Sequence, residues 1–392
     1  MYYVEKTKGT DYFKQFDYPL FAAVLLLSAY GIIALRSALG SPSSTDTLVP
    51  GVSNVWLKQV ICLGIGIIAA IVISAIDYKD FKTLGIVLYL GSIALLVLVL
   101  IIGKETNGTM GWIEVPVIGG FQPSELSKVA YVVIVPLFFE RLKEGKNVGK
   151  NVVKLIIYAL LPIGLVLLQP DVGTAMVFVF AFVVLLFIYG IPYKYFLIAI
   201  GAFAAAAPII WLYVLPMKRF DHIRNRILTF IFPENDLLGA GLQVYRSKVT
   251  IGSGQIFGKG IFYGLRESGT SSMFNVPANE TDFIFSVIGE EMGFIGSVIF
   301  VLIVFFLLFR IIQISMSARD MYGSYMAICV AAMLGFHFIE NIGMCIGVMP
   351  VTGIPLPFVS QGNSSLIANY LNIGILLSIS MRRKKTIFNS SQ

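Results

Sequence analysis

The sequence has 392 residues, of which 57% are hydrophobic and only 13% are charged. Soluble globular chains are about 45 to 50% apolar, so this composition excludes a water-soluble protein and indicates an integral membrane protein. The net charge of +7 is therefore interpreted through membrane topology, and no nucleic-acid partner is expected. With three cysteines in apolar runs and two histidines, neither a disulfide framework nor a zinc centre is indicated.

Ten segments are apolar and long enough to cross a bilayer as helices. They cover residues 18–38, 57–76, 83–103, 125–140, 154–169, 172–190, 195–216, 283–309, 322–347 and 364–381. The fourth is interrupted by Glu125 and Lys128, and the fifth by Pro162. The first is too long for a signal peptide and is expected to be retained. The pattern predicts an all-α polytopic membrane protein with ten transmembrane helices.

The distribution of lysine and arginine predicts how these helices are oriented. With both termini in the cytoplasm, 17 of the 29 Lys and Arg residues face that side, and four lie at external positions. The other eight lie in residues 218–282, a 65-residue extracytoplasmic loop between the seventh and eighth helices. We expect a single membrane domain, residues 1–392, in the plasma membrane.

Charged residues inside the predicted helices are candidate functional groups. Glu125 and Lys128 are three residues apart, so they can meet on one helix face, and three further glutamates lie at positions 290, 291 and 340. An ionised group at mid-helix costs about 2.5 to 3.5 kcal/mol on insertion scales, so such groups face a polar cavity or a partner. Buried ion pairs that only fix helix packing are the alternative.

Asp282 differs from these groups in depth. It lies eight residues before Glu290, which is roughly 12 Å along a helix with a rise of about 1.5 Å per residue. It is therefore expected at the outer mouth of the eighth helix, as a candidate catalytic group. An ordinary role in satisfying free N–H groups of the first turn is the alternative.

The long loop contains the glycine-rich stretch "GSGQIFGKG", residues 252–260. Its spacing does not match a Walker A loop, and it would face the outside, where ATP is scarce, so nucleotide binding is excluded. A turn whose N–H groups bind a phosphate and a plain flexible turn are both compatible with the stretch.

Several stretches form a distinctive series: "FQPSE" (121–125), "QPDVGT" (169–174), "IGSG" with "GKG", "TDFIFSVIGEEMGFIG" (281–296), and "NIGM" followed by "PVTGIPLPF" (350–358). This series resembles the SEDS family (shape, elongation, division, sporulation), and most of all its rod-shape branch. The resemblance covers nearly the whole chain. It implies a ten-helix fold and a peptidoglycan glycosyltransferase that polymerises lipid II, an undecaprenyl-linked disaccharide, at the outer face of the bacterial plasma membrane during cell elongation.

The resemblance also implies roles for single residues. The aspartate of the "TDF" motif is required for catalysis in the family, which indicates Asp282, and a functionally sensitive tryptophan indicates Trp112. The chain departs from the usual family pattern at Gly111, Arg246, Ala278 and within residues 360–365. These departures bear on substrate contacts in those loops rather than on the catalytic assignment.

Transfer of a sugar from a lipid pyrophosphate needs a base for the attacking 4-hydroxyl and cations or N–H donors for the departing pyrophosphate. We predict Asp282 as the base. The other candidate substrate-binding residues are charged groups expected around the same lipid-side cavity, with the cations contacting the pyrophosphate: Glu125, Lys128, Asp171, Arg246, Lys248 and Glu290. The sequence requires no metal site or cofactor, although a divalent cation, Mg²⁺ or Mn²⁺, would help to neutralise the pyrophosphate.

Two other classes of function fit the same residues. A lipid II flippase would also need polar residues along a membrane cavity, and a non-catalytic scaffold of the cell-wall machinery would need no chemistry. The chain has no SxxK-type serine in a soluble domain with which to cross-link peptides. The resemblance therefore implies a class B penicillin-binding protein transpeptidase as partner, together with other membrane proteins of the elongation complex.

Overall fold

The computed structural model describes residues 15–39, 55–106, 109–115, 119–145, 147–214, 216–217, 221–232, 236, 239–263 and 276–383. In this part of the chain, nine helices are long and apolar enough to cross a membrane. They are α1 (Tyr18–Ala38), α2 (Val55–Ala75), α3 (Phe81–Ile102), α5 (Val148–Leu168), α6 (Val172–Tyr189), α7 (Tyr193–Ile209), α11 (Ile284–Ser317), α12 (Met321–Cys345) and α13 (Asn363–Met381). The prediction of a helical, multi-pass membrane protein is confirmed.

Helix α4 (Pro123–Lys143) corresponds to the fourth predicted span, but its composition sets it apart from the nine. It has 21 residues and is long enough to cross a bilayer. Charged residues lie near both of its ends, and nearly all of its side chains are buried. It packs against α3, α5 and α12, so its polar groups meet protein rather than lipid.

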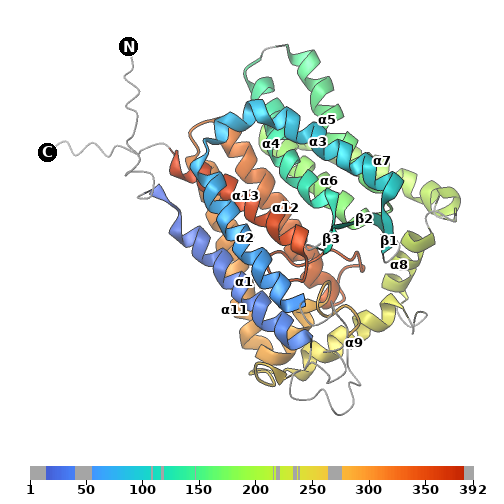
Figure 1. The fold of residues 1–392 in the computed structure, drawn as a ribbon. Coiled ribbons are helices and arrows are strands. Elements are labelled where there is room, and N and C mark those ends of the chain that lie inside the picture. The colour runs from blue at the N-terminus through green and yellow to red at the C-terminus, as the bar shows by residue number, and fades with distance from the viewer. Residues whose placement is uncertain are drawn as a thin grey trace.

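The centre of the bundle is formed by α4, α12 and α13, which are buried over most of their surface. Figure 1 shows α12 and α13 in the middle, with α2 beside α13. The outer helices expose large apolar side chains, and α7 has no buried residue at all. These exposed apolar faces suit a lipid environment, because the helices satisfy their own backbone hydrogen bonds and apolar side chains can face the acyl chains.

A small antiparallel sheet lies in the connection between α3 and α4, within the otherwise helical fold. Its strands are β1 (Lys104–Thr106), β2 (Thr109–Val115) and β3 (Gly119–Phe121), in the order β1-β2-β3. Ile113 of β2 pairs with Phe121 of β3. No strands were predicted from the sequence in this segment, which joins α3 to α4. Its aromatic and β-branched residues favour the extended backbone instead.

The predicted 65-residue loop is only partly described, since residues 218–220, 233–235, 237–238 and 264–275 lie outside the described ranges. The described residues of this segment form two helices, α8 (Asp221–Ile231) and α9 (Ala240–Ser253). Helix α9 packs against α11 and α12. The segment therefore covers the end of the bundle with helices.

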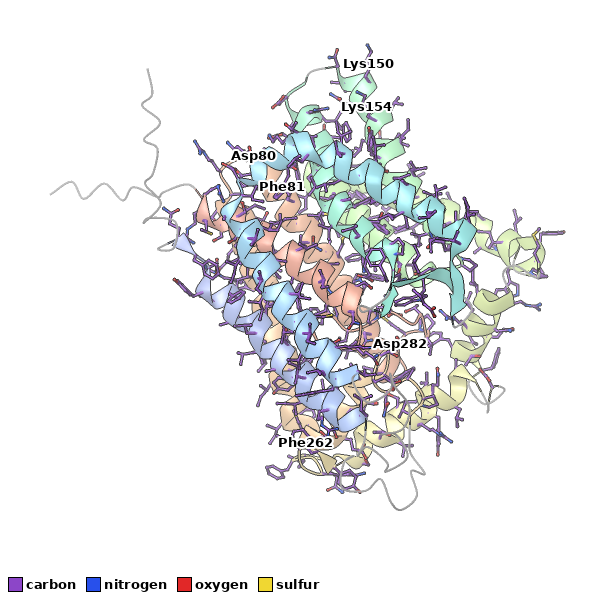
Figure 2. All side chains as sticks on the ribbon, in the orientation of Figure 1. Asp80, Phe81, Lys150, Lys154, Phe262 and Asp282 are labelled. Atoms are coloured by element: carbon purple, nitrogen blue, oxygen red, sulfur yellow. The ribbon has the colours of Figure 1, made fainter. Side chains whose placement is uncertain are left out.

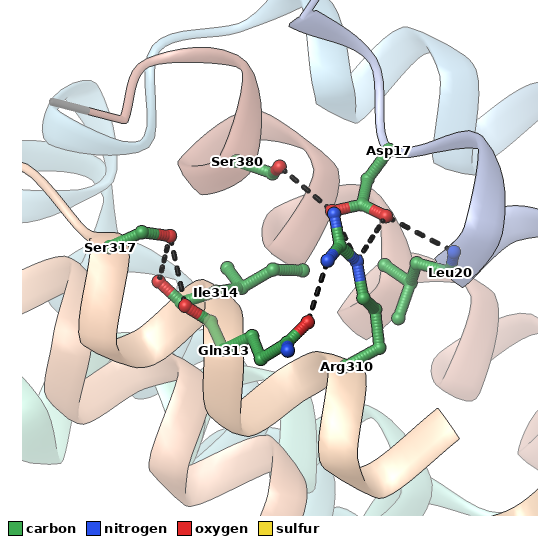
Figure 3. Close-up of polar contacts among 7 residues, drawn as sticks. All are labelled: Asp17, Leu20, Arg310, Gln313, Ile314, Ser317 and Ser380. Carbon is green, nitrogen blue, oxygen red and sulfur yellow. Dashed lines mark hydrogen bonds and ion pairs between the residues drawn. The ribbon is translucent and has the colours of Figure 1, made fainter. Parts of the chain in front are cut away.

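One end of the bundle is fastened by a polar cluster around Asp17 (Figure 3). The Asp17 carboxylate accepts hydrogen bonds from the backbone N–H of Leu20 (3.1 Å), Nε of Arg310 (2.8 Å) and the hydroxyl of Ser380 (3.1 Å). These contacts join the start of α1 to α11 and α13. Both ends of the described chain therefore lie at the same end of the bundle.

Candidate active site

Asp282 lies at the other end of α11, in a tight turn that precedes the helix (Figure 2). Ala278 adopts a left-handed conformation with φ of 60°. Its carbonyl oxygen accepts hydrogen bonds from the N–H groups of Thr281 (3.2 Å) and Phe283 (3.1 Å). A left-handed alanine costs roughly 1 to 2 kcal/mol, so the surrounding contacts hold this turn in a strained shape.

Helix α12 holds the backbone of this turn. The side-chain amide of Asn341 donates to the carbonyl oxygens of Asp282 and Ile354, both at 2.8 Å. The thiol of Cys345, one turn further along, lies 3.7 Å from the same Asp282 oxygen. A single buried amide therefore joins the turn before α11 to the loop after α12.

That loop also contacts both the Asp282 carboxylate and a cation from α8, Arg226. Gly353 has φ of 80°, and a Cβ placed on it would lie 3.4 Å from Oδ2 of Asp282 and 3.9 Å from the guanidinium of Arg226. The carboxylate and the guanidinium thus face the same glycine. Arg226, from α8, donates from Nη1 to the carbonyl oxygen of Thr352 at 2.7 Å. The Thr352 hydroxyl in turn donates to the carboxylate of Glu340.

The electrostatic surroundings of Asp282 suit a general base. Burial raises its pKa to about 6, and the nearby carboxylates of Glu280 and Asp171 act in the same direction. Arg226 and the Thr281 hydroxyl oppose this shift because they favour the charged form. A base works best when its pKa lies near the ambient pH, so this net upward shift suits the role of a base.

Asp171 joins the site from the start of α6. Its Oδ1 accepts the backbone N–H of Thr174, and its Oδ2 accepts Nε2 of Gln122, both at 3.0 Å. A Cβ placed on Gly173 would lie 3.2 Å from the carbonyl oxygen of Thr352. The starts of α4 and α6 therefore meet the loop that carries Gly353.

Glu125 and Lys128 form an ion pair of 2.9 Å, and both side chains are almost fully buried. Nζ of Lys128 also lies 3.0 Å from Nε2 of His337 in α12. The second carboxylate oxygen of Glu125 is buried without a hydrogen-bond partner among the described residues. The expected pair on one helix face is confirmed, and it lies in the interface between α4 and α12.

Helix α9 places Arg246 and Lys248 near the end of α12. Between them, the Ser247 hydroxyl donates to the carbonyl oxygen of Cys345 at 2.8 Å. Lys248 is exposed, and its side-chain carbons would lie 3.2 Å from a Cβ on Gly347. Both cations therefore lie on a helix that contacts Cys345, the residue whose thiol lies near the Asp282 carbonyl oxygen.

Trp112 is half-buried in β2. A Cβ on its neighbour Gly111 would lie 3.6 Å from the Gln169 side chain and 3.7 Å from that of Gln122, so the strand approaches the group around Asp171.

Glu290 is placed differently from the other candidates. It pairs with Lys259 at 2.7 Å rather than with the residues around Asp282.

Arg226 was not among the residues predicted for the site. The sequence shows it only as one of eight basic residues in the long loop, and nothing local indicates which of them folds back onto Asp282. Among the described residues, no group of three or more His, Cys, Asp or Glu is arranged to hold a metal ion.

Comparison with known proteins identifies chains that are similar over most of the sequence. A family model for FtsW, RodA and SpoVE, described as cell cycle protein, matches residues 18–385. The chain is 33% identical to the probable peptidoglycan glycosyltransferase FtsW of Trichlorobacter lovleyi, covering 93% of each chain. It is also 33% identical to the peptidoglycan glycosyltransferase MrdB of Escherichia coli K12, covering 82% of this chain and 84% of MrdB.

The fold is similar to that of a chain in a solved peptidoglycan synthase complex, a structure concerned with the coordination of polymerization and crosslinking. The TM-score is 0.76 and the sequence identity is 30%, over 93% of this chain and 97% of that chain. The likeness therefore extends over most of the fold of both chains.

Proposed function

The chain belongs to the FtsW, RodA and SpoVE family of cell cycle proteins, and from this we infer that it is a peptidoglycan glycosyltransferase that polymerises lipid II. Relatives that cover most of the chain carry this activity in their names. The observation that carries the site assignment is the Asp282 carboxylate, with a pKa of about 6 and Arg226 beside it. We assign this protein to the rod-shape branch of the family, with a role in cell elongation, because of its sequence motifs.

In the proposed reaction, Asp282 accepts the proton of the 4-hydroxyl that attacks the donor sugar. With a pKa of about 6, the carboxylate is mostly ionised at pH 7 and can take up this proton. Arg226 keeps the carboxylate charged and oriented before the transfer. The departing pyrophosphate gains negative charge, which cationic side chains stabilise.

We assign the remaining candidates to substrate binding. Arg246 and Lys248 contact the pyrophosphate from α9, and Trp112 stacks on a sugar. Asp171, at the start of α6, lines the path of the headgroup, and the buried pair of Glu125 and Lys128 supports this wall from the interface between α4 and α12. A divalent cation would enter with the pyrophosphate of the donor rather than occupy a protein site, so polymerisation in EDTA should fall only through weaker donor binding.

The proposed topology has ten spans, with α4 as the fourth, both termini in the cytoplasm and Asp282 outside. It is supported by the bias of lysine and arginine, and by the Asp17 and Ser380 contact at the end of α11 opposite Asp282. A cysteine in place of Ser391 should resist a membrane-impermeant reagent in intact cells. Its modification would overturn this orientation.

A class B penicillin-binding protein is the proposed partner, together with other elongation proteins. The support is the structural likeness to a chain of a synthase complex that couples polymerization with crosslinking. Purification from native membranes in mild detergent should recover a transpeptidase. Its repeated absence would contradict the partnership without affecting the catalytic assignment.

The proposed activity is tested by incubating the purified protein with labelled lipid II and a class B partner. A glycosyltransferase forms glycan chains, whereas a flippase moves lipid across vesicles without forming polymer. A scaffold should yield no product with any partner, because a class B penicillin-binding protein cross-links peptides and does not form glycan chains. Loss of polymer in Asp282→Asn, with binding of lipid II retained, is the expected result.

A further inference from the structure

Helix α11 is interrupted inside its apolar stretch. Gly293 has φ of 64° and ψ of −163°, which divides α11 into a short upper part, residues 284–292, and a long lower part, residues 294–317. A break of this kind leaves carbonyl and N–H groups without their partners in the helix. In a membrane each unsatisfied group costs several kcal/mol, so another segment must supply partners.

Residues 254–260, here called the clasp, supply these partners. Two of its N–H groups donate to the upper part of α11, and two of its carbonyl oxygens accept from the lower part. The bonds are Lys259 N–H to Glu290 O (2.9 Å), Gly260 N–H to Glu291 O (3.0 Å), Phe294 N–H to Gln255 O (2.8 Å) and Ile295 N–H to Ile256 O (3.1 Å). The clasp therefore completes the broken helix from outside.

The contact is so close that only glycine fits. A Cβ on Gly254 would lie 2.0 Å from the carbonyl oxygen of Gly289, and one on Gly258 would lie 2.1 Å from that of Glu291. A Cβ on Gly293 would lie 2.3 Å from the backbone nitrogen of Gly258. Gly254 and Gly258 of "GSGQIFGKG" thus allow one backbone to lie directly against another, a role that differs from both a phosphate loop and a flexible turn.

Side chains strengthen this contact on both faces of the short upper helix. Nζ of Lys259 lies 2.7 Å from Oε1 of Glu290, and both side chains are partly buried. On the other face, the Ser37 hydroxyl of α1 donates to the buried carboxylate of Glu291. The upper helix, which begins two residues after Asp282, is therefore held between the clasp and α1.

We propose that the clasp sets the position of the Asp282 carboxylate, with Lys259 and Glu290 as positioning residues for glycosyl transfer. This inference rests on the proposed function. The clasp continues directly from α9, which carries Arg246 and Lys248. The same contact therefore fixes the helix that bears the base relative to the helix that bears the cations for the pyrophosphate.

The test uses Lys259→Met, which removes the charge and keeps the backbone bonds of the clasp, and Glu290→Gln. Because a displacement of about 1 Å can cost 100-fold, we expect kcat to fall roughly 10- to 100-fold. KM should stay within about twofold, since the substrate contacts are retained. The reversed pair, Lys259→Glu with Glu290→Lys, should recover most of kcat.

A second readout separates positioning from general damage to the fold. If the upper helix is loosened, water reaches residue 282, so the acid limb of the pH profile should move to lower pH. The thiol of the Asp282→Cys variant should also react several times faster with a membrane-impermeant maleimide when Lys259→Met is present. A loss of folded protein would instead lower the rate by the same factor at every pH and leave the position of the acid limb unchanged.

Lys79→Met is the matched control, because Lys79 forms a partly exposed ion pair with Asp320 at 3.4 Å. The neighbouring Asp80 is far from Asp282 in Figure 2, and this variant should polymerise like the wild type. Unchanged kcat, pH profile and labelling in Lys259→Met, with an active wild type, would overturn the clasp proposal alone. An inactive wild type with its partner present would contradict the proposed function instead.

Discussion

Asp17 and Asp282 each lie just before a long helix, at opposite ends of the bundle. Their carboxylates differ in the groups that contact them. Both oxygens of Asp17 accept hydrogen bonds from protein groups, which include the guanidinium of Arg310 and the hydroxyl of Ser380 (Figure 3). At Asp282 the strong hydrogen bond, from Asn341, goes to the backbone oxygen. Its carboxylate faces Gly353 and Arg226.

This difference separates a stabilising carboxylate from a reactive one. A buried carboxylate whose hydrogen bonds are filled by protein groups stabilises the fold, and breaking such a set is costly. A carboxylate whose pKa is raised by desolvation, as that of Asp282 is, remains available to accept a proton from a substrate. The sequence alone shows two aspartates at helix starts, and only the contacts from distant helices distinguish them.

The largest expected effect is that of Asp282→Asn. The variant keeps the size of the side chain but removes the base, so polymerisation should fall by roughly 10² to 10⁴. Folded yield should be retained, because the Asn341 contact is made to the backbone. Near wild-type polymerisation by a well-folded Asn variant would end the catalytic assignment.

The same variant should reveal a cost in stability. The folded pKa of about 6 exceeds the unfolded value of about 3.9, so the ionised Asp282 carboxylate destabilises the fold above pH 6. This effect disappears as the pH falls towards 4. Thermal unfolding in detergent should therefore show Asp282→Asn to be at least as stable as the wild type at pH 8. A clearly lower midpoint would indicate a structural role for the charge.

A smaller effect is expected for Arg226→Met. The guanidinium favours the ionised form of Asp282, so its removal should raise the pKa of Asp282 and move the acid limb of the rate to higher pH. At pH 7 polymerisation should fall by about tenfold, and Arg226→Lys should retain more activity because it keeps the charge. An unchanged pH profile in Arg226→Met would show that Arg226 does not influence the pKa of Asp282.

The smallest effect on catalysis is expected for Asp17→Asn. It weakens hydrogen bonds to a charged partner, which contribute about 1.5 to 3 kcal/mol each, so the unfolding midpoint should fall. The rate per folded molecule should stay within about twofold of the wild type, because Asp17 lies at the opposite end of α11. A large loss in rate without a loss in stability would remove the contrast between the two aspartates.

Much of the helical architecture could be predicted from local apolar runs. Residues 18–38 are also the bounds of α1, and the predicted 364–381 differs from α13 by one residue at its start. Helix α11 continues to Ser317, beyond the predicted end at residue 309, because helical backbone can extend past the apolar run. The length of an apolar run is a local property, so these elements needed no knowledge of their neighbours.

The features that the sequence did not predict depend on distant partners. The break at Gly293 is stable because residues 254–260, more than thirty positions earlier, satisfy its backbone. Arg226 is held near Asp282 by its hydrogen bond to Thr352, in the loop where Gly353 lies next to both side chains. The candidate base itself was predicted, but its cation and its support required the folded chain.

The pH dependence of polymerisation tests the central claim, that Asp282 is the general base, most directly. With lipid II and the class B partner held constant, kcat/KM should be flat above about pH 7 and fall tenfold per pH unit below about 6, where Asp282 becomes protonated. Asp282→Glu should keep an acid limb at a lower maximal rate, and Asp282→Asn should lose it. A wild-type rate that is constant from pH 7.5 to pH 5, with the protein still folded, would contradict the assignment.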